Sequence, residues 1–195
     1  MAMTELSTLL PLMSVPRCPQ ALQLLALRLA SRRFCEDTGM WTEDLTSFDT
    51  EADEADYELA SDYDNVSIRR ATKVTVDDVE MTEDTWELSA SGVLTFDPAP
   101  TITELDVVVT VVYVPDVTCV EVVDWLITRW GEAIAAGAEA HLKREPGNTN
   151  DPNPWYDATS AAVAERRYQD GVGAAKLEII SARQSGQLGV EFPVF

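Results

Sequence analysis

Apolar and small residues recur every three or four positions between residues 117 and 144, the spacing of one face of a helix. We therefore predict one long helix there, which would span roughly 40 Å at about 1.5 Å per residue. Asp116 is placed to cap its start, Lys143 complements the dipole near its end, and Pro146 stops it. The expected inner face comprises Val123, Leu126, Ile127, Trp130, Ile134, Gly137, Ala138, His141 and Leu142.

Three further segments carry a helical pattern. Residues 4–13 predict a short helix, and residues 19–38 predict a strong one that Gly39 ends and on whose end Trp41 folds back. Residues 154–185 predict a final helix with a small-residue inner face, which allows close approach to the long helix. The expected inner positions are Leu22, Leu24, Leu25, Ala26, Leu27, Leu29 and Phe34 in the strong helix, and Ala161, Ala164, Tyr168, Val172, Ala175, Ile179 and Ala182 in the final one.

The period changes to that of strands between residues 42 and 114, where Thr, Val, Tyr, Phe and Trp dominate and turn-like clusters intervene. We expect about five or six antiparallel strands in a small sandwich or open barrel. The run over residues 105–114 is the longest expected strand. Its almost continuous valines indicate burial on both faces, or a central place in the sheet.

These elements predict an α+β fold: a helical bundle of the N-terminal and two long C-terminal helices, with an inserted antiparallel β sub-domain and an extended C-terminal tail. Residues 1–42 and 115–186 would form the helical scaffold, residues 43–114 the acidic β insert, and residues 187–195 the tail. Four apolar side chains of the tail would be exposed unless a partner covers them, namely Val190, Phe192, Val194 and Phe195.

The charge is unevenly distributed. The net charge is −20, and residues 34–128 hold 24 acidic and 3 basic side chains, whereas the other segments hold 10 acidic and 11 basic ones. Such a chain should not bind nucleic acid through a general basic surface. Two interpretations stay open: a solubilising acidic face, or a negative field directed at a basic partner or along a conduit for DNA.

The remaining composition points to a reduced, non-membrane protein. Cys18, Cys35 and Cys119 are an odd number without metal-ligand spacing, and we expect all three to be reduced core residues. No basic, apolar leader opens the sequence, and no apolar run approaches the roughly 20 residues that span a bilayer. We expect a chain that is cytosolic when made.

Candidate chemistry is sparse, and we expect neither an enzyme nor a metal or cofactor site. The acid-rich residues 49–64 lack the glycine and terminal glutamate of a calcium loop, and residues 171–176 lack the full phosphate-loop pattern. His141 is the single histidine, too little for a zinc site or a catalytic triad. Three arginine pairs, Arg32-Arg33, Arg69-Arg70 and Arg166-Arg167, fit salt bridges between subunits better than nucleic-acid readout.

Two stretches resemble the head-to-tail adaptor (connector) proteins of tailed bacteriophages. LALRLASRRFCEDTGMW resembles their opening helix, which ends in Phe-Cys-x-x-Thr-x-x-Trp, here Phe34, Cys35, Thr38 and Trp41. The pair of helices that follows the β region resembles their C-terminal pair through residues 132–138 (EAIAAGA), a loop with Pro154-Trp155, and an Arg-x-Tyr-x-x-Gly segment at residues 166–171. The order helix, β insert, two helices and tail also resembles the podovirus tail-tubular adaptor. The resemblance covers about half of the chain directly.

The resemblance implies a structural virion protein at the capsid–tail junction. Such adaptors form a ring, commonly of twelve copies, beneath the portal protein; they extend the DNA channel and dock the tail nozzle or the next neck protein. DNA would be only passing cargo. The residues expected to bind the portal or a neighbouring subunit are Val190, Phe192, Pro193, Val194 and Phe195, and those expected at the ring interface are Arg166, Arg167 and Tyr168.

Other classes of protein stay open. A neck stopper or tail-completion protein of the same particle would share the insert and the acidity, but would not bind portal rings directly. An enzyme would need a pocket in which a perturbed acid or base converges with other groups. A β-rich binding module would stay monomeric even with portal present.

Overall fold

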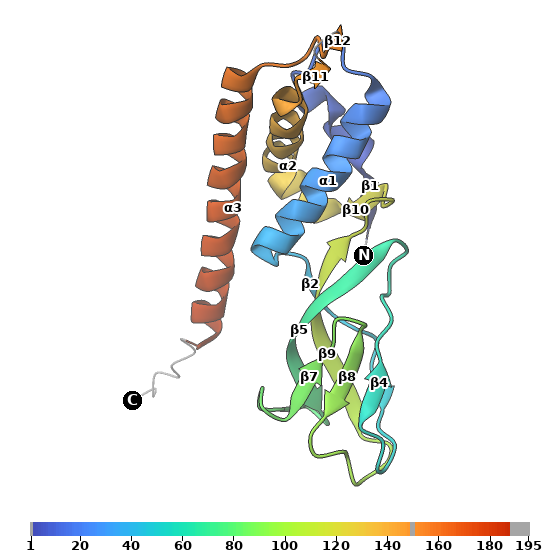
Figure 1. The fold of residues 1–195 in the computed structure, drawn as a ribbon. Coiled ribbons are helices and arrows are strands. Elements are labelled where there is room, and N and C mark those ends of the chain that lie inside the picture. The colour runs from blue at the N-terminus through green and yellow to red at the C-terminus, as the bar shows by residue number, and fades with distance from the viewer. Residues whose placement is uncertain (1, 149–150, 188–195) are drawn as a thin grey trace, which may run out of the picture. The chain divides into compact units, whose positions relative to one another are not determined.

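The computed structural model describes residues 2–148 and 151–187, and these fall into two compact units. The helical unit comprises Met1–Met40 and Val120–Phe195, and the β unit is the continuous segment Trp41–Cys119. Figure 1 shows the helices and strands of each unit.

Three helices make up most of the helical unit: α1 (Gln20–Thr38), α2 (Asp124–Arg144) and α3 (Ala158–Gln187). Gly39 ends α1 in the left-handed conformation (φ 65°), as predicted, and its N–H donates to the Cys35 carbonyl. The N-terminal segment covers the helices as a strand, β1 (Met3–Glu5), and a 3₁₀ helix, η1 (Leu6–Leu12). The shorter strands are β10 (Glu121–Val123), paired with β1, and the pair β11 (Gly147–Asn148) and β12 (Asp151–Pro152).

The core of the helical unit is built from the inward faces of these elements. The large side chains with 2% or less of their surface exposed are Leu6, Leu9, Leu27, Phe34, Leu126, Ile134 and Tyr168. Phe34 is their aromatic centre, with ring centroids 5.8 Å from Trp130 and 6.4 Å from Tyr168. Each such side chain stabilises the fold by about 1.5–3 kcal/mol on burial.

The β unit contains two antiparallel sheets. Five strands form one sheet, ordered β2-β9-β5-β6 with β3 also paired to β9, and three form the other, ordered β4-β8-β7. Their bounds are β2 (Thr42–Asp44), β3 (Phe48–Asp49), β4 (Asp56–Glu58), β5 (Val66–Val76), β6 (Val79–Glu80), β7 (Trp86–Leu88), β8 (Val93–Phe96) and β9 (Asp106–Pro115). The central position predicted for residues 105–114 is confirmed by β9, which pairs with β2, β3 and β5.

The predicted fold class, a helical bundle carrying a β insert, is wrong. The chain is mixed α/β with several antiparallel sheets, one of which is curled as a half-barrel. Strands also pair inside the helical unit, and the β unit has eight strands where five or six were expected. The register between β5 and β9 shifts twice, between Ile68 and Arg70 and between Ala71 and Lys73. Such bulges increase local twist and bend a strand, which accounts for the curl.

Residues 117–123 do not join the long helix, contrary to prediction. α2 begins at Asp124, and Glu121–Val123 pair with Met3–Glu5 as β10. Consecutive β-branched residues favour a strand where an extended partner is at hand, and that partner lies some 120 residues away in sequence. Asp116 caps no helix; it accepts a hydrogen bond from the Ser67 hydroxyl at 2.6 Å.

Two local predictions need correction. Residues 4–13 begin as a strand, and the predicted short helix is a 3₁₀ helix, Leu6–Leu12, with Pro11 inside it and not at its end. Trp41, expected to fold back on the end of α1, belongs to the β unit. Its ring, fully buried, packs on Tyr63 and Tyr113 of the β unit at centroid distances of 5.4 and 5.7 Å, and its indole N–H donates to Glu43 at 2.9 Å.

Candidate assembly surfaces of the helical unit

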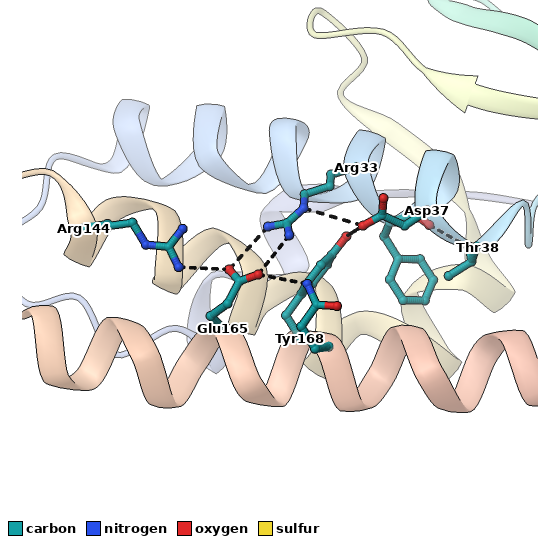
Figure 2. Close-up of polar contacts among 8 residues, drawn as sticks. Arg33, Asp37, Thr38, Arg144, Glu165 and Tyr168 are labelled. Carbon is teal, nitrogen blue, oxygen red and sulfur yellow. Dashed lines mark hydrogen bonds and ion pairs between the residues drawn. The ribbon is translucent and has the colours of Figure 1, made fainter.

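Tyr168 lies where the three helices meet, and its ring is fully buried. Its hydroxyl donates to Asp37 of α1 at 2.9 Å, and the Arg33 guanidinium lies over its ring at 4.4 Å from the centroid. Figure 2 shows these groups between α1 and α3. Burial and the bond to Asp37 both raise the pKa of the Tyr168 hydroxyl, so this group stays a proton donor. The resemblance implies that Tyr168 lies at the interface between neighbouring subunits. In this structure its aromatic ring is buried within the helical unit.

Glu165 connects all three helices by charge. It accepts hydrogen bonds from Arg33 of α1 at 2.8 Å, from Arg144 of α2 at 3.3 Å and from Gln169 of its own helix at 2.9 Å (Figure 2). The bond from Arg33 is the main cause that lowers the pKa of Glu165 to about 2. Arg32 likewise pairs with Glu36 at 3.1 Å, so both arginines of this pair make salt bridges within the helical unit.

Small residues let α2 and α3 approach closely. A Cβ added at Gly137 would come within 2.7 Å of the Tyr168 ring, and one at Gly171 would collide with Ala133. Gly137 and Gly171 are therefore packing positions, where any larger side chain would separate the helices. Of the inner face predicted for the final helix, the positions from Ala161 to Ala175 are buried.

The outward face of α3 is apolar at several exposed positions. Val163, Leu177 and Ile180 are 60%, 66% and 50% exposed, and they lie on the side away from the buried Ala164 and Tyr168. Arg166 and Arg167, expected at the ring interface, are exposed on the same helix. This face therefore presents separate exposed apolar side chains, with the exposed Arg166 and Asp170 between Val163 and Leu177 along the helix. The expected partner-binding residues Val190 to Phe195 lie outside the described residues.

A separate apolar groove lies where α1, α2 and the start of α3 meet. Leu22 and Leu25 of α1 are each 40% exposed and line a groove of about 230 Å³ with Leu142 and Trp155. The sequence placed both leucines in a buried stripe, because helical period marks an apolar face but not what covers it. Val163 lines a different hollow, with Glu139 and Lys143, so the groove and the outward face of α3 are distinct surfaces.

The surface of the β unit is strongly acidic. Trp41–Cys119 hold 20 acidic and 3 basic residues. A hollow of about 390 Å³ is walled by the stacked rings of Phe48 and Tyr57, with centroids 5.2 Å apart, and by carboxylates that include Glu51 and Asp62. Among the described residues, no group of three histidine, cysteine or carboxylate side chains is placed to hold a metal. The hollow suits a positively charged side chain better than an anion.

The other predicted residues take structural places. Cys18, Cys35 and Cys119 are buried and none is in a disulfide, which confirms their assignment to the core. His141 is exposed and lines the groove described above. Within the described ranges, no helix has the length and apolar character needed to cross a membrane.

The motif residues of the resemblance divide between the two units. Phe34 and Cys35 are buried in the helical unit, where Thr38 donates to the Phe34 carbonyl at 2.6 Å, whereas Trp41 belongs to the core of the β unit. No protein-family model matches the chain, and no curated protein matches it either.

Proposed function

We propose that this chain is the head-to-tail adaptor of a tailed bacteriophage. Its copies form a ring, dodecameric by the resemblance, beneath the portal protein; the ring extends the DNA channel and docks the tail nozzle or the next neck protein. The protein acts in the virion at the capsid–tail junction, after assembly in the host cytoplasm. It has a structural role and no enzymatic one.

The observation that carries this proposal is the pair of separate apolar surfaces on the helical unit. The outward face of α3 presents Val163, Leu177 and Ile180, and the groove presents Leu22 and Leu25 on the other side of α2. A two-fold dimer needs one self-complementary patch, whereas a ring needs two different patches that meet head to tail. Two distinct surfaces on one small unit therefore favour a cyclic assembly.

The charge distribution supports the same function. Outside Trp41–Cys119 the chain holds 14 acidic and 11 basic residues, so the helical unit is close to neutral and its copies can pack without strong repulsion. The β unit carries a net charge of about −17, which repels the phosphates of DNA that passes nearby. A ring of such subunits suits a conduit that DNA traverses without binding.

The test is direct mixing with portal rings. The pure protein should elute as a monomer from a sizing column and should shift to the portal fraction when purified portal rings are added. Substitution of both Leu177 and Ile180 by glutamate should abolish the shift, because a charge replaces an exposed apolar contact. Val79→Glu, at a 65% exposed position of the β unit, is the matched control, and this variant should elute with the portal rings as the original chain does.

The same mixing experiment separates the proposal from its nearest rival. A neck stopper or tail-completion protein of the same particle would leave portal rings unbound and would attach only after another neck protein had been added. Failure of the original chain to bind portal rings directly would therefore overturn the adaptor assignment.

A further inference from the structure

The groove between α1 and α2 is lined by Trp155, which carries a hydrogen-bond donor, as well as by apolar side chains. The indole nitrogen of Trp155 is buried and has no hydrogen-bond partner among the described residues. Leu22, Leu25 and Leu142 line the same groove as Trp155, together with His141 and Glu145. A buried donor without an acceptor costs about 1–3 kcal/mol. The groove therefore favours an occupant that brings both an apolar side chain and an oxygen acceptor.

The dimensions of the groove favour an anchoring side chain over a small molecule. Its volume of about 230 Å³ lies below the roughly 300–1,000 Å³ of typical small-molecule sites. Two leucines that remain 40% exposed at its mouth would be covered by the chain that carries such an anchor. An extended peptide segment satisfies both conditions, because its backbone carbonyls supply acceptors along its length.

Residues 188–195 have the matching composition. The sequence LGVEFPVF places apolar side chains at every second position from Leu188 to Val194, with Phe195 adjoining them. Its single charged residue, Glu191, is a further acceptor for an indole N–H. Proline at residue 193 favours an extended backbone for Phe192, so less conformational freedom is lost on docking.

The length of α3 prevents this segment from reaching the groove of its own chain. α3 has 30 residues and is about 45 Å long, and the groove is lined by Asn153 and Trp155, which precede its first turn. Eight residues that leave Gln187 span at most about 29 Å when fully extended. The segment falls short by more than 10 Å, so the groove that it can fill belongs to another copy.

We infer that residues 188–195 of one copy dock in the groove of a neighbouring copy, with a phenylalanine between Leu22 and Leu25 and a backbone or Glu191 oxygen on the Trp155 N–H. This inference rests on the proposed function, because the proposed ring is what brings copies of the chain together. It assigns the apolar segment to the neighbouring subunit and not to the portal. Because each copy gives one segment and receives another, the exchange is a head-to-tail contact, which forms a ring when the rotation from copy to copy closes.

The test uses the full chain and a labelled synthetic peptide of residues 187–195. Since its own segment cannot reach it, the groove is open in the isolated protein, and the peptide should bind with a saturable rise in fluorescence anisotropy. Leu25→Glu should weaken binding by about tenfold or more, as expected for loss of a central apolar contact. Val163→Glu, also at an exposed apolar position of the helical unit, is the matched control and should bind the peptide as the original chain does.

Two further variants make the outcome specific. Trp155→Phe keeps the ring but removes the N–H, so it should weaken binding by about threefold to tenfold while the thermal unfolding of the protein is unchanged. A peptide carrying F192S and F195S should not bind. The inference is overturned if the native peptide fails to bind, or if Leu25→Glu binds it as well as the original chain.

The two proposals fail separately. If portal rings bind the protein but the peptide does not, the adaptor function stands and residues 188–195 have another partner. If the peptide binds and the portal rings do not, the groove is a contact between copies and the adaptor assignment is wrong.

Discussion

Glu165 shows how one side chain can hold three helices together. It lies on α3, and its carboxylate meets Arg33 from α1 and Arg144 from α2, while Tyr168 one turn later donates to Asp37. A carboxylate whose lone pairs are taken by two guanidinium groups is strongly favoured in its charged form, which is why its pKa falls to about 2. These charged and aromatic groups hold the three helices of the unit together.

Glu165→Gln should lower the free energy of unfolding by about 1–2 kcal/mol at pH 7. The loss is smaller than the full pKa shift would give, because Arg33 and Arg144 remain 44% and 58% exposed and solvent screens them. The folded-state pKa lies below its ordinary value of 4.5, so the contribution is present above pH 4.5 and disappears as the pH falls towards 2. Urea unfolding of both proteins at pH 7, 4 and 2.5 measures this.

At each pH the free energy of unfolding of Glu165→Gln is compared with that of the original chain. Acidification also relieves the repulsion of a net charge of −20, and this effect is common to both proteins. Glu178→Gln, which loses a more exposed pair with Arg129, is the matched control on the same helix and should change stability by less than about 0.5 kcal/mol. A pH-independent difference for Glu165→Gln would show that the carboxylate is not held in its charged form by its partners.

At the scale of the elements, the contact between α2 and α3 depends on residues that oppose helix formation. Gly137 faces the Tyr168 ring and Gly171 faces Ala133, so the cost of glycine in a helix is offset by a closer approach of the two axes. Gly173, two residues further along α3, has no atom of the described residues within 4 Å of the place its Cβ would take, apart from the local helix backbone. The same residue type therefore has opposite roles on two faces of the pair.

Gly137→Ala should destabilise the protein by about 1–3 kcal/mol, because a methyl group 2.7 Å from a fully buried ring forces the ring or the helix to move. Gly173→Ala should instead stabilise it by about 0.5–1 kcal/mol through helix propensity alone. Thermal unfolding of the two variants beside the original chain provides the comparison. Equal effects of the two substitutions would mean that propensity, and not packing, governs both positions.

Elements set by local sequence could be predicted well. The helical period of the apolar residues, together with the glycine that ends the segment, predicted the bounds of α1 to within one residue. The small-residue face predicted for α3 is buried from Ala161 to Ala175. Continuous valines correctly identified β9 as a central strand. In each case the forces that decide the structure act within a few turns or along one strand, where the sequence pattern records them.

Elements set by distant partners could not be predicted. Valines at residues 122 and 123 fit a helix until Met3–Glu5 supply a strand to pair with, and Trp41 follows α1 in sequence yet packs on Tyr63 and Tyr113. The groove was missed for a related reason. Leu22 continues the same apolar stripe as the buried Ala26, yet it is 40% exposed, because helical period does not record which elements cover a position.

At the scale of the whole molecule, the two units differ in their charge and in their exposed apolar surface. The β unit carries nearly all of the excess negative charge on a core of its own, with Trp41, Leu94 and Val109 buried in it. The helical unit is nearly neutral and carries both the groove and the exposed apolar positions of α3. Residues 188–195 follow α3, in which Ala175 is the last buried position among the side chains that the structure describes.

Removal of residues 188–195 should leave the fold intact and abolish attachment. The described core ends well before Gln187, so the melting temperature of the truncated chain should match that of the original within about 1 °C, which corresponds to a few tenths of a kcal/mol. The truncated chain should still elute as a monomer but should no longer join portal rings, because neighbouring copies have lost the segment that links them. A chain that keeps residues 188–195 but carries F192A is the control for length, and should be impaired less than the truncation. Normal attachment of the truncated chain would remove these residues from assembly and leave the outward face of α3 as the contact between copies.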